Sequence, residues 1–286
     1  MAIADKLTEL QATKTAIKTA IEEKGQSLTN VPFTQYAEVI KAIQGGGGGS
    51  ETPNIWGKAL KNLTSFYNLF KNLSDMTDAD LATSGISKDN TSQVTSVEGM
   101  FNRCSSITRT PEMDLQNCTN MKMFVERCTG LKSLPMYDTK KVTNFQSCIY
   151  NCVELEEIPA WDVRSGTNFG YGVSYNRNVK NIWLKNIKAN FDLTTCDSVT
   201  QECIIHIIKE LRNTGSAKTL SLGSTNMKKI TGDNAVYVKT IAITDEMRAE
   251  DDLIDEKSPF VVCESTDEGA MLITEYAKTK NWNIAG

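Results

Sequence analysis

The same residue types recur every 24 positions through the middle of this 286-residue sequence. Cysteine, an aliphatic residue, proline and aspartate each form a separate column with this spacing. The members of the four columns are Cys104, Cys128 and Cys152; Ile107, Leu131, Leu155 and Val179; Pro111, Pro135 and Pro159; and Asp114, Asp138 and Asp162. A repeat of this length is one small unit that cannot bury its apolar side alone, so successive copies are expected to stack, with equivalent residues forming ladders.

Each unit is predicted to contain one helical turn and one extended rung. Met121, Val125 and Cys128 are spaced four and three apart, which would place them on one face of a helical turn. The segment from Leu131 to Asp138 contains a proline and is too short for a helix, so we expect a short strand there. The predicted fold class is therefore α/β, a solenoid of about four to five coils.

The unit from Thr143 to Val163 resembles a leucine-rich repeat of the BspA-like, bacterial surface-antigen type. The resemblance covers roughly residues 55–190 and implies a leucine-rich-repeat solenoid that serves recognition. Residues 63–70 match residues 94–101 at an offset of 31, which implies a seven-residue insertion in the first copy. At Asn176 the cysteine column is interrupted, and the regular array is expected to end near residue 190.

Residues 191–286 are expected to form degenerate repeats and an α/β cap over the open end of the array. Asp197 and Ser198 are predicted to cap a helix with an apolar face from Val199 to Leu211. A strand is expected at residues 219–223, a similar segment at residues 226–230, and a second helix at residues 266–278.

The first 44 residues have a different, helical pattern. A heptad seam predicts an oligomerisation helix, in which the seam positions are Ile3, Leu7, Leu10, Lys14, Ile17 and Ile21. A second helix carries an apolar stripe expected to serve attachment, formed by Phe33, Tyr36, Ile40 and Ile43. Residues 45–54, with five consecutive glycines, are predicted to be a flexible linker.

Residues 1 to about 43 resemble the attachment module at the start of many bacteriophage tail and baseplate proteins. The resemblance lies in the Ala- and Lys-rich helix that ends at Lys24-Gly25, followed by Pro32-Phe33. It implies a virion protein, assembled in the host cytoplasm, that contacts other tail or baseplate proteins. A homotrimer is the preferred oligomer, on the resemblance to tail fibres, because Lys14 in the seam leaves the state open.

The cysteine and aspartate columns could in principle carry chemistry. Cys104, Cys128 and Cys152 could lie within disulfide or metal reach of one another, but a small apolar side chain that fills one core position in each unit is the favoured interpretation. The aspartates could supply a catalytic acid and base in a glycan-cleaving enzyme, but equivalent residues in a ladder favour turn capping. We expect no catalytic residues, no metal and no cofactor.

Aromatic residues give the candidate ligand-binding residues Tyr171, Tyr175 and Trp183, which could form a platform for sugar rings. Tyr137 and Trp161 share a repeat column and are expected to be core. The net charge of −4 excludes general attraction to nucleic acid. Apolar runs are too short for a bilayer, so we expect no membrane insertion.

The predicted function is a bacteriophage tail or baseplate structural protein, attached through its N-terminal helices, whose repeat domain recognises a glycan or protein on the host surface. Three alternatives remain: a structural accessory or decoration protein without a receptor role, a bacterial surface adhesin, and a tail-associated glycan depolymerase. The adhesin would need an export signal and a wall anchor, neither of which is visible. The depolymerase would release sugars from host material.

Overall fold

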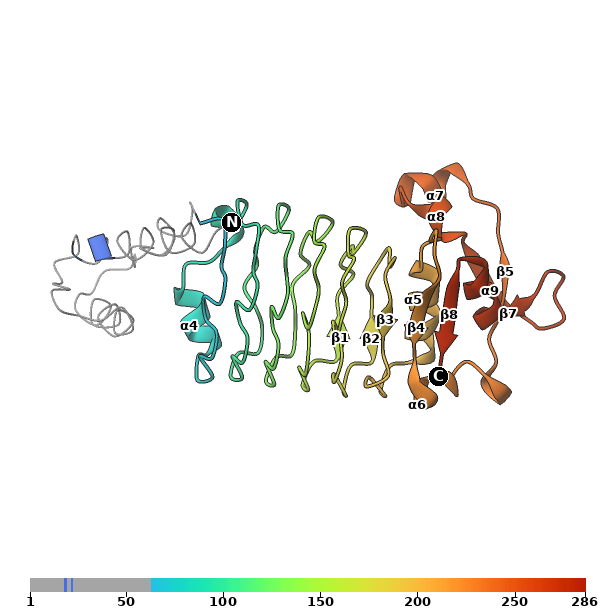
Figure 1. The fold of residues 1–286 in the computed structure, drawn as a ribbon, viewed down its shortest axis with the longest axis horizontal. Coiled ribbons are helices and arrows are strands. Elements are labelled where there is room, and N and C mark those ends of the chain that lie inside the picture. The colour runs from blue at the N-terminus through green and yellow to red at the C-terminus, as the bar shows by residue number, and fades with distance from the viewer. Residues whose placement is uncertain (1–17, 20–21, 23–62) are drawn as a thin grey trace.

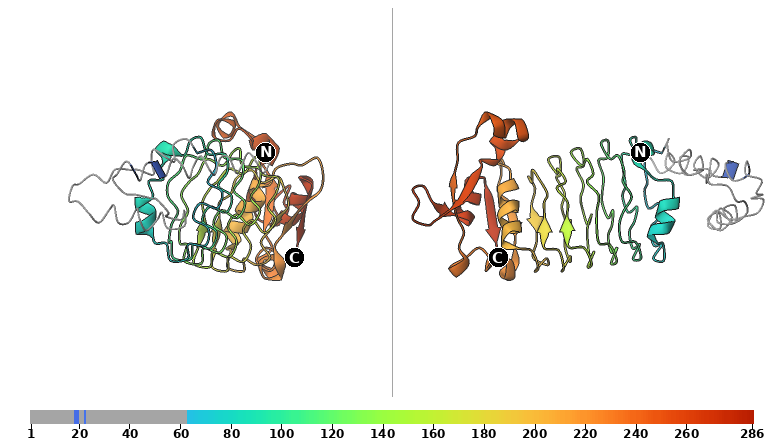
Figure 2. Two further views of the ribbon diagram at one scale, coloured as in Figure 1. Left: turned by 60° about the vertical axis from the view of Figure 1, so that its left-hand side comes forward. Right: turned by 180° about the vertical axis from the view of Figure 1, so that it is seen from behind.

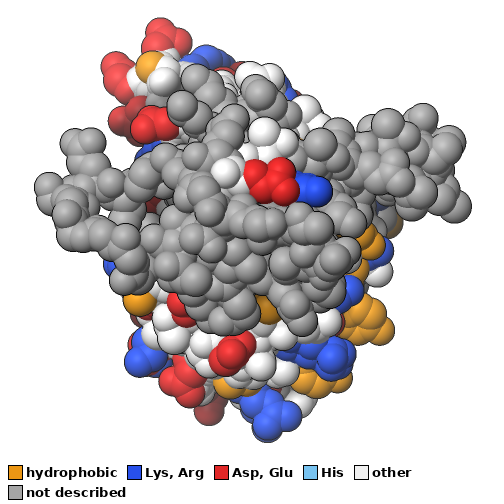
Figure 3. Space-filling model, turned by 90° about the vertical axis from the view of Figure 1, so that its left-hand side faces the viewer, with side chains coloured by type: hydrophobic (Ala, Val, Ile, Leu, Met, Phe, Trp, Pro, Cys, Tyr) orange, Lys and Arg blue, Asp and Glu red, His pale blue; other side chains and the backbone are white. Residues whose placement is uncertain are grey.

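The computed structural model describes residues 18, 19, 22 and 63–286. The predicted oligomerisation seam from Ile3 to Ile21, the attachment residues from Phe33 to Ile43 and the linker at residues 45–54 lie outside the described residues. Lys18 and Glu22 form an i,i+4 ion pair with a distance of 3.7 Å between Nζ and Oε1. The end-on view of Figure 3 shows hydrophobic side chains and charged side chains of both signs on the described part of this face.

The predicted fold class, a leucine-rich-repeat solenoid, is wrong. The described chain is a mixed α/β structure of short helices and small sheets, in which the largest sheets have three strands and the longest helix has 10 residues. Its helices are α4 (Asp78–Thr83), η2 (Lys88–Asn90), α5 (Gln201–Glu210), α6 (Gly223–Met227), η3 (Gly232–Asn234), α7 (Asp245–Glu250), α8 (Ile254–Lys257) and α9 (Ile273–Thr279). Its strands are β1 (Glu157–Ile158), β2 (Asn181–Ile182), β3 (Phe191–Asp192), β4 (Lys218–Ser221), β5 (Tyr237–Thr240), β6 (Phe260–Cys263), β7 (Met271–Leu272) and β8 (Trp282–Ala285).

Between α4 and α5 the chain makes successive loops that lie side by side (Figures 1 and 2). Most of these loops are joined by single bridging pairs instead of continuous strands. Parallel bridges join Asn120 to both Ser96 and Asn144, and Asn144 to Asn168. We call each such loop a unit; residues 24 apart in this part of the chain lie in neighbouring units.

The predicted helical turn within each unit is also wrong, because the segment is a ribbon of turns. Met123 and Arg127 have φ values of 53° and 61°, in the left-handed region, which no α-helix tolerates. The amides of Met121 and Val125 donate to the next unit, to the carbonyls of Asn144 and Cys148, both at 3.0 Å. The ribbon buries positions spaced three and four apart, as an amphipathic helix does, so the apolar pattern does not distinguish the two.

The left-handed positions recur in every unit of the ribbon. They are Asn68 and Asn72, Gly99 and Arg103, Met123 and Arg127, Ser147 and Asn151, and Tyr171 and Tyr175. The amide hydrogen bonds explain the recurrence: alternate amides donate across to the next unit and the others donate three residues back, as Phe124 does to the Met121 carbonyl at 3.2 Å. The hydrogen-bond pattern of the backbone therefore requires a left-handed conformation at these positions, whatever the side chain is.

The core lies inside the units and continues to α5. Aromatic rings follow one another through it: Phe101 contacts Phe124 at 5.5 Å between ring centroids, and Tyr137 contacts Trp161 at 5.5 Å. Tyr137 and Trp161 are 3% and 1% exposed. Edge-to-face and tilted ring pairs of this kind add to the free energy of burial.

The C-terminal part contains two three-stranded sheets. The parallel sheet has the order β3-β4-β8 and the antiparallel sheet has the order β6-β5-β7. The helix predicted after residue 198 is α5, but its N-cap is Thr200, whose hydroxyl accepts from the Cys203 amide at 3.1 Å. Residues 226–230, predicted to repeat the preceding strand, fall at the end of α6 and in the following turn. The second predicted helix is α9, which is shorter because β7 occupies residues before it.

Two buried lysines of the C-terminal part, Lys257 and Lys280, contact the C-terminal end of α5. Lys280 is fully buried, and its ammonium donates to the carbonyls of Leu211 at 3.0 Å and Ile208 at 3.3 Å, at the end of α5. Burial lowers the pKa of Lys280 from 10.5 to about 7. Lys257 is 3% exposed and pairs with Glu210 at 2.9 Å. Cationic donors at a helix C-terminus satisfy carbonyls that have no partner within the helix.

The turn ribbon predicts the effect of a substitution at Gly99. A Cβ there would lie 2.1 Å from Asn68 Oδ1, and φ is +64°. We expect Gly99→Ala to lower the free energy of unfolding by about 1–3 kcal/mol, because both the contact and the left-handed backbone oppose it. Gly215→Ala is the control, since a Cβ at Gly215 meets nothing within 4 Å. Urea denaturation of both variants measures the difference, and equal midpoints would contradict the account.

Candidate ligand-binding groove

The cysteine column lies in the core, and each of its thiols donates to a backbone carbonyl of the preceding unit. Cys128 Sγ donates to the Phe101 carbonyl at 2.9 Å, and Cys152 Sγ donates to the Val125 carbonyl at 3.1 Å. Asn176 stands in this column in the next unit, and its side-chain Nδ2 donates to the Ile149 carbonyl at 2.5 Å. The side chain in this column therefore links each unit to the preceding one through a backbone carbonyl.

This placement suppresses cysteine chemistry. All eight cysteines are free, and seven are buried. Burial raises the pKa of Cys104 and Cys152 to about 12, so at neutral pH these side chains are thiols and not the thiolates that bind metals or react. In the described part of the chain, no group of three or more His, Cys, Asp or Glu side chains is arranged to hold a metal ion.

The aspartate column lies at turns. Oδ1 of Asp114, Asp138 and Asp162 accepts from the amide two residues later, at 3.1, 3.2 and 3.0 Å. Burial acts to raise the pKa of Asp162, but hydrogen bonds from Arg164 and Asn186 outweigh it, so the pKa lies below its usual value. A carboxylate held ionised in this way does not provide the general acid of a hydrolase.

The structure brings two of the three candidate ligand-binding residues together and separates the third. Tyr171 is 59% exposed and Tyr175 is 39% exposed, and the Tyr150 ring contacts both at centroid distances of 6.3 and 5.2 Å. Trp183 instead follows β2, where its ring packs edge-on against His206 of α5 at 5.1 Å. The three tyrosines form a surface cluster, and Trp183 belongs elsewhere.

Sequence reasoning missed Tyr150. The signal was available, because the 24-residue spacing places position 151 beside position 175 in the next unit. The Asn151 amide indeed donates to the Ser174 carbonyl at 3.0 Å, which brings Tyr150 beside the unit that carries Tyr175.

A groove opens beside Tyr171, with a volume of about 530 Å³. We call it the tyrosine groove. It is lined by Thr167, Asn168, Phe169, Gly170, Tyr171, Ala189, Asn190, Phe191, Asp192, Lys218, Thr219 and Ser221. Its walls therefore come from the Tyr171 unit, from β3 and from β4. The volume is within the range of about 300–1,000 Å³ typical of small-ligand sites.

Gly170 contributes to this space by lacking a side chain. The two preceding units carry Lys122 and Gln146 at the equivalent position. A Cβ at Gly170 would meet Asn168 Oδ1 at 3.4 Å and Gln146 Cγ at 3.8 Å, which are ordinary contacts. The backbone thus does not require glycine here, and its effect is to leave room next to the Tyr171 ring.

The polar groups of the groove are oriented by the backbone. Asn168 Oδ1 accepts from the Gly170 amide at 3.1 Å, and Asn190 Oδ1 accepts from the Thr219 amide at 3.0 Å. Each contact fixes the carboxamide, and within residues 63–286 neither NH₂ group has a hydrogen-bond partner. Asp192 Oδ1 is occupied by the amide and hydroxyl of Thr194. The groove therefore offers two oriented amide donors, one carboxylate and the Lys218 ammonium beside an exposed aromatic ring.

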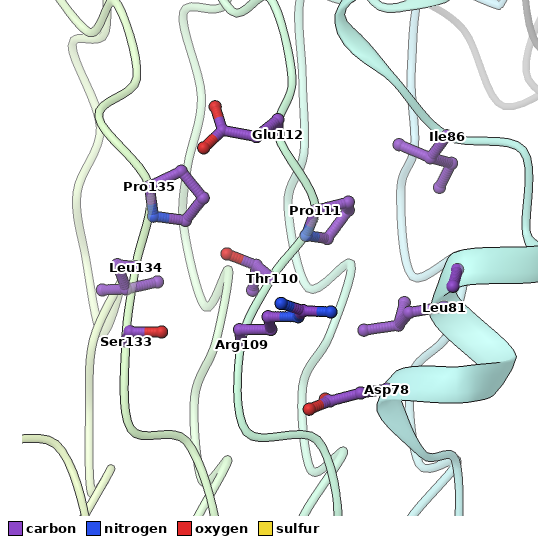
Figure 4. Close-up of a pocket in the computed structure, with 11 residues that line it drawn as sticks. Asp78, Leu81, Ile86, Arg109, Thr110, Pro111, Glu112, Ser133, Leu134 and Pro135 are labelled. Atoms are coloured by element: carbon purple, nitrogen blue, oxygen red, sulfur yellow. The ribbon is translucent and has the colours of Figure 1, made fainter.

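A second cavity of about 430 Å³ lies between α4 and the neighbouring units (Figure 4). Figure 4 shows Leu81 and Ile86 on one side and the rings of Pro111 and Pro135 on the other, with Arg109 below Pro111 and its guanidinium directed toward Leu81. Asp78 at its edge is already engaged by the Thr108 amide at 2.8 Å and by the Thr108 hydroxyl. Glu112 pairs with Lys88 at 3.1 Å, and none of the residues that line this cavity is aromatic, so it is the weaker candidate for a sugar site.

Residues 64–187 are similar to a family described as "Mycoplasma protein of unknown function, DUF285". The match covers the stacked units and ends before β3. No curated protein and no solved structure matches the chain significantly. The tyrosine groove straddles the end of the matched stretch, since β3 and β4 lie beyond it.

In the described part of the chain, every helix is too short or too polar to cross a bilayer.

The thiol environments predict a selective labelling pattern. Cys263 is the one cysteine that is not fully buried. We expect Ellman's reagent to label one thiol in the native protein and eight after unfolding in guanidinium chloride, because buried thiols with raised pKa values react slowly. The Cys263→Ser variant should show no fast labelling; rapid labelling of several thiols in the native protein would contradict the buried ladder.

Proposed function

We propose that this chain is a carbohydrate-binding protein and that the tyrosine groove is its binding site. The observation that carries the proposal is the exposed Tyr171 ring beside a polar groove with two oriented amide donors. Sugar rings have apolar C–H faces and polar edges, so they match a site where an aromatic face adjoins fixed hydrogen-bond donors.

Binding without cleavage is favoured over a depolymerase. The residues that line the tyrosine groove include a single carboxylate, Asp192. Glycoside hydrolysis ordinarily needs two carboxyl groups on opposite sides of the scissile bond. The aspartate column does not supply the second one, since its members lie at turns and accept backbone amides.

We further propose that the protein is displayed on a bacteriophage tail or baseplate. The N-terminal 44 residues, which resemble a tail attachment module, support this proposal, and so does the glycine linker that follows them. Display of several copies would multiply a weak sugar contact through effective concentration. The alternative of an accessory protein without a receptor role accounts equally well for the N-terminal sequence, but it does not explain the exposed tyrosines.

The binding proposal predicts the effect of two substitutions. Tyr171→Gly removes the ring and places glycine at a left-handed position, where φ is 57°. Gly170→Gln fills the groove with the side chain that Gln146 has in the preceding unit. Both should reduce binding at least tenfold, and Tyr171→Gly should also raise the free energy of unfolding by about 1 kcal/mol.

Binding is measured by biolayer interferometry on an array of bacterial polysaccharides. Met136→Ala is the control, because Met136 is 57% exposed outside the groove and should leave binding unchanged. Wild-type affinity in both groove variants, or no binding of the wild type to any polysaccharide, would refute the proposed site.

The display proposal predicts a separate result. A chain lacking residues 1–44 should keep the urea midpoint of the full chain, because residues 63–286 contain their own backbone hydrogen-bond network and hydrophobic core. It should be absent from purified phage particles probed by immunoblot. Continued incorporation of the truncated chain would contradict the attachment role.

A further inference from the structure

Basic side chains lie on both sides of the three tyrosines. The Arg127 amide donates to the Tyr150 carbonyl at 2.7 Å, so Arg127 stands in the unit next to Tyr150. Arg103 is one unit further, since its amide donates to the Glu126 carbonyl at 2.8 Å. On the opposite side, Lys218 lines the tyrosine groove together with Tyr171. A ligand that follows the row of units across the tyrosines would meet positive charge at both ends.

The acidic groups nearby are turned toward donors of the protein. The Glu126 side chain is 17% exposed and accepts from Asn102 Nδ2 at 3.2 Å. Asp192 accepts from the Thr194 amide at 2.8 Å. Both carboxylates keep their negative charge, but these hydrogen bonds hold the Glu126 carboxylate and Asp192 Oδ1 toward groups of the protein.

The basic groups have few such partners. The Arg127 side chain is 46% exposed, and its contact with Glu126 is long, 3.8 Å between Nε and Oε1. Within residues 63–286, neither Arg103 nor Lys218 has an ion-pair partner. Arg103, Arg127 and Lys218 are therefore available to pair with an anionic ligand, although the whole chain carries a net charge of −4.

We propose that the ligand of the tyrosine groove is an anionic polysaccharide, in which a carboxylate or phosphate recurs along the chain. This inference rests on the proposed carbohydrate-binding function and specifies its ligand class. The sugar rings contact the Tyr150, Tyr171 and Tyr175 rings, and the acidic groups pair with Arg127 and Lys218. A guanidinium forms two parallel hydrogen bonds with either a carboxylate or a phosphate.

The repeat geometry fits a polymer better than a single sugar. Arg103, Arg127, Asn151 and Tyr175 occupy one column in four successive units. Paired backbone segments lie about 4.8 Å apart, so neighbouring members of the column are separated by roughly this distance. A flexible polysaccharide can follow such a row and place successive charges along it.

The test compares three probes on the full chain: polygalacturonate, a phosphomannan and dextran. The first two carry carboxylates and phosphates, and dextran is neutral. At 50 mM NaCl we expect at least one anionic probe to bind tenfold or more tighter than dextran, and this preference to fall with added salt because the attraction is electrostatic. The stronger of the two anionic probes identifies which acidic group is recognised.

The variant Arg127→Gln/Lys218→Gln should lose the preference for the anionic probe over dextran, because both cations that pair with the acidic groups are removed. Lys132→Gln/Lys209→Gln, at two exposed lysines outside the groove, is the matched control and should keep the preference. Urea midpoints establish that all variants are folded.

Three outcomes decide between the proposals. Equal, salt-independent binding of dextran and both anionic probes, abolished by Tyr171→Gly, would overturn the charge inference and leave carbohydrate binding intact. Wild-type preference in Arg127→Gln/Lys218→Gln would also overturn the inference. Absence of binding to every probe and to the polysaccharide array would overturn carbohydrate binding itself.

Discussion

The described structure depends on backbone hydrogen bonds between neighbouring units. Along the turn ribbon, every second amide donates to a carbonyl of the next unit, which from Val97 onward lies 23 residues later in the chain: Met123 to Gln146 at 2.9 Å is one example. On the same side the Thr119 and Thr143 amides donate back to the equivalent threonine of the preceding unit, at 2.8 and 2.9 Å. These contacts hold successive units in register although regular strands in this region are at most two residues long. Because each buried amide and carbonyl needs a partner, the ladder also fixes the left-handed residues of the ribbon.

Side chains of the cysteine column also form hydrogen bonds between neighbouring units. Cys104, Cys128, Cys152 and Cys196 each donate to a carbonyl of the preceding unit, and Asn176 replaces cysteine without losing this contact. Asn226, after β4, donates to the Leu193 carbonyl at 3.2 Å and is fully buried. A small donor that reaches a carbonyl is thus the requirement at this position, and cysteine meets it with little polar surface. The abundance of cysteine therefore has a structural cause and does not indicate redox chemistry.

The sequence carried information about which residues are neighbours and little about backbone conformation. A fixed spacing of 24 residues relates Asn120 to Asn144 and Asn168, which form bridges in the structure. The fold class was predicted wrongly, because residues buried at spacings of three and four occur both in an amphipathic helix and in a ribbon of turns. Glycine, the residue that most often marks a left-handed position, did not indicate the ribbon, because Gly99 is the one glycine among the left-handed positions of its five units. The position of Trp183 could not be predicted for a related reason, since its contact with His206 depends on α5, which lies outside the repeat.

The binding surface follows from the same backbone constraint. Because the ladder imposes left-handed φ values, side chains at these positions do not enter the core, and their identity varies from unit to unit. One column carries Gly99, Met123, Ser147 and Tyr171, whereas in the same four units the inner column keeps a small hydrogen-bond donor, Cys104, Cys128, Cys152 or Asn176. An aromatic residue at a left-handed position costs stability relative to glycine or asparagine, and nothing in the packing of the core requires the Tyr171 ring, which is 59% exposed. The feature that weakens the fold at this position is therefore the one that a ligand would use, so stability and ligand binding are opposed at Tyr171.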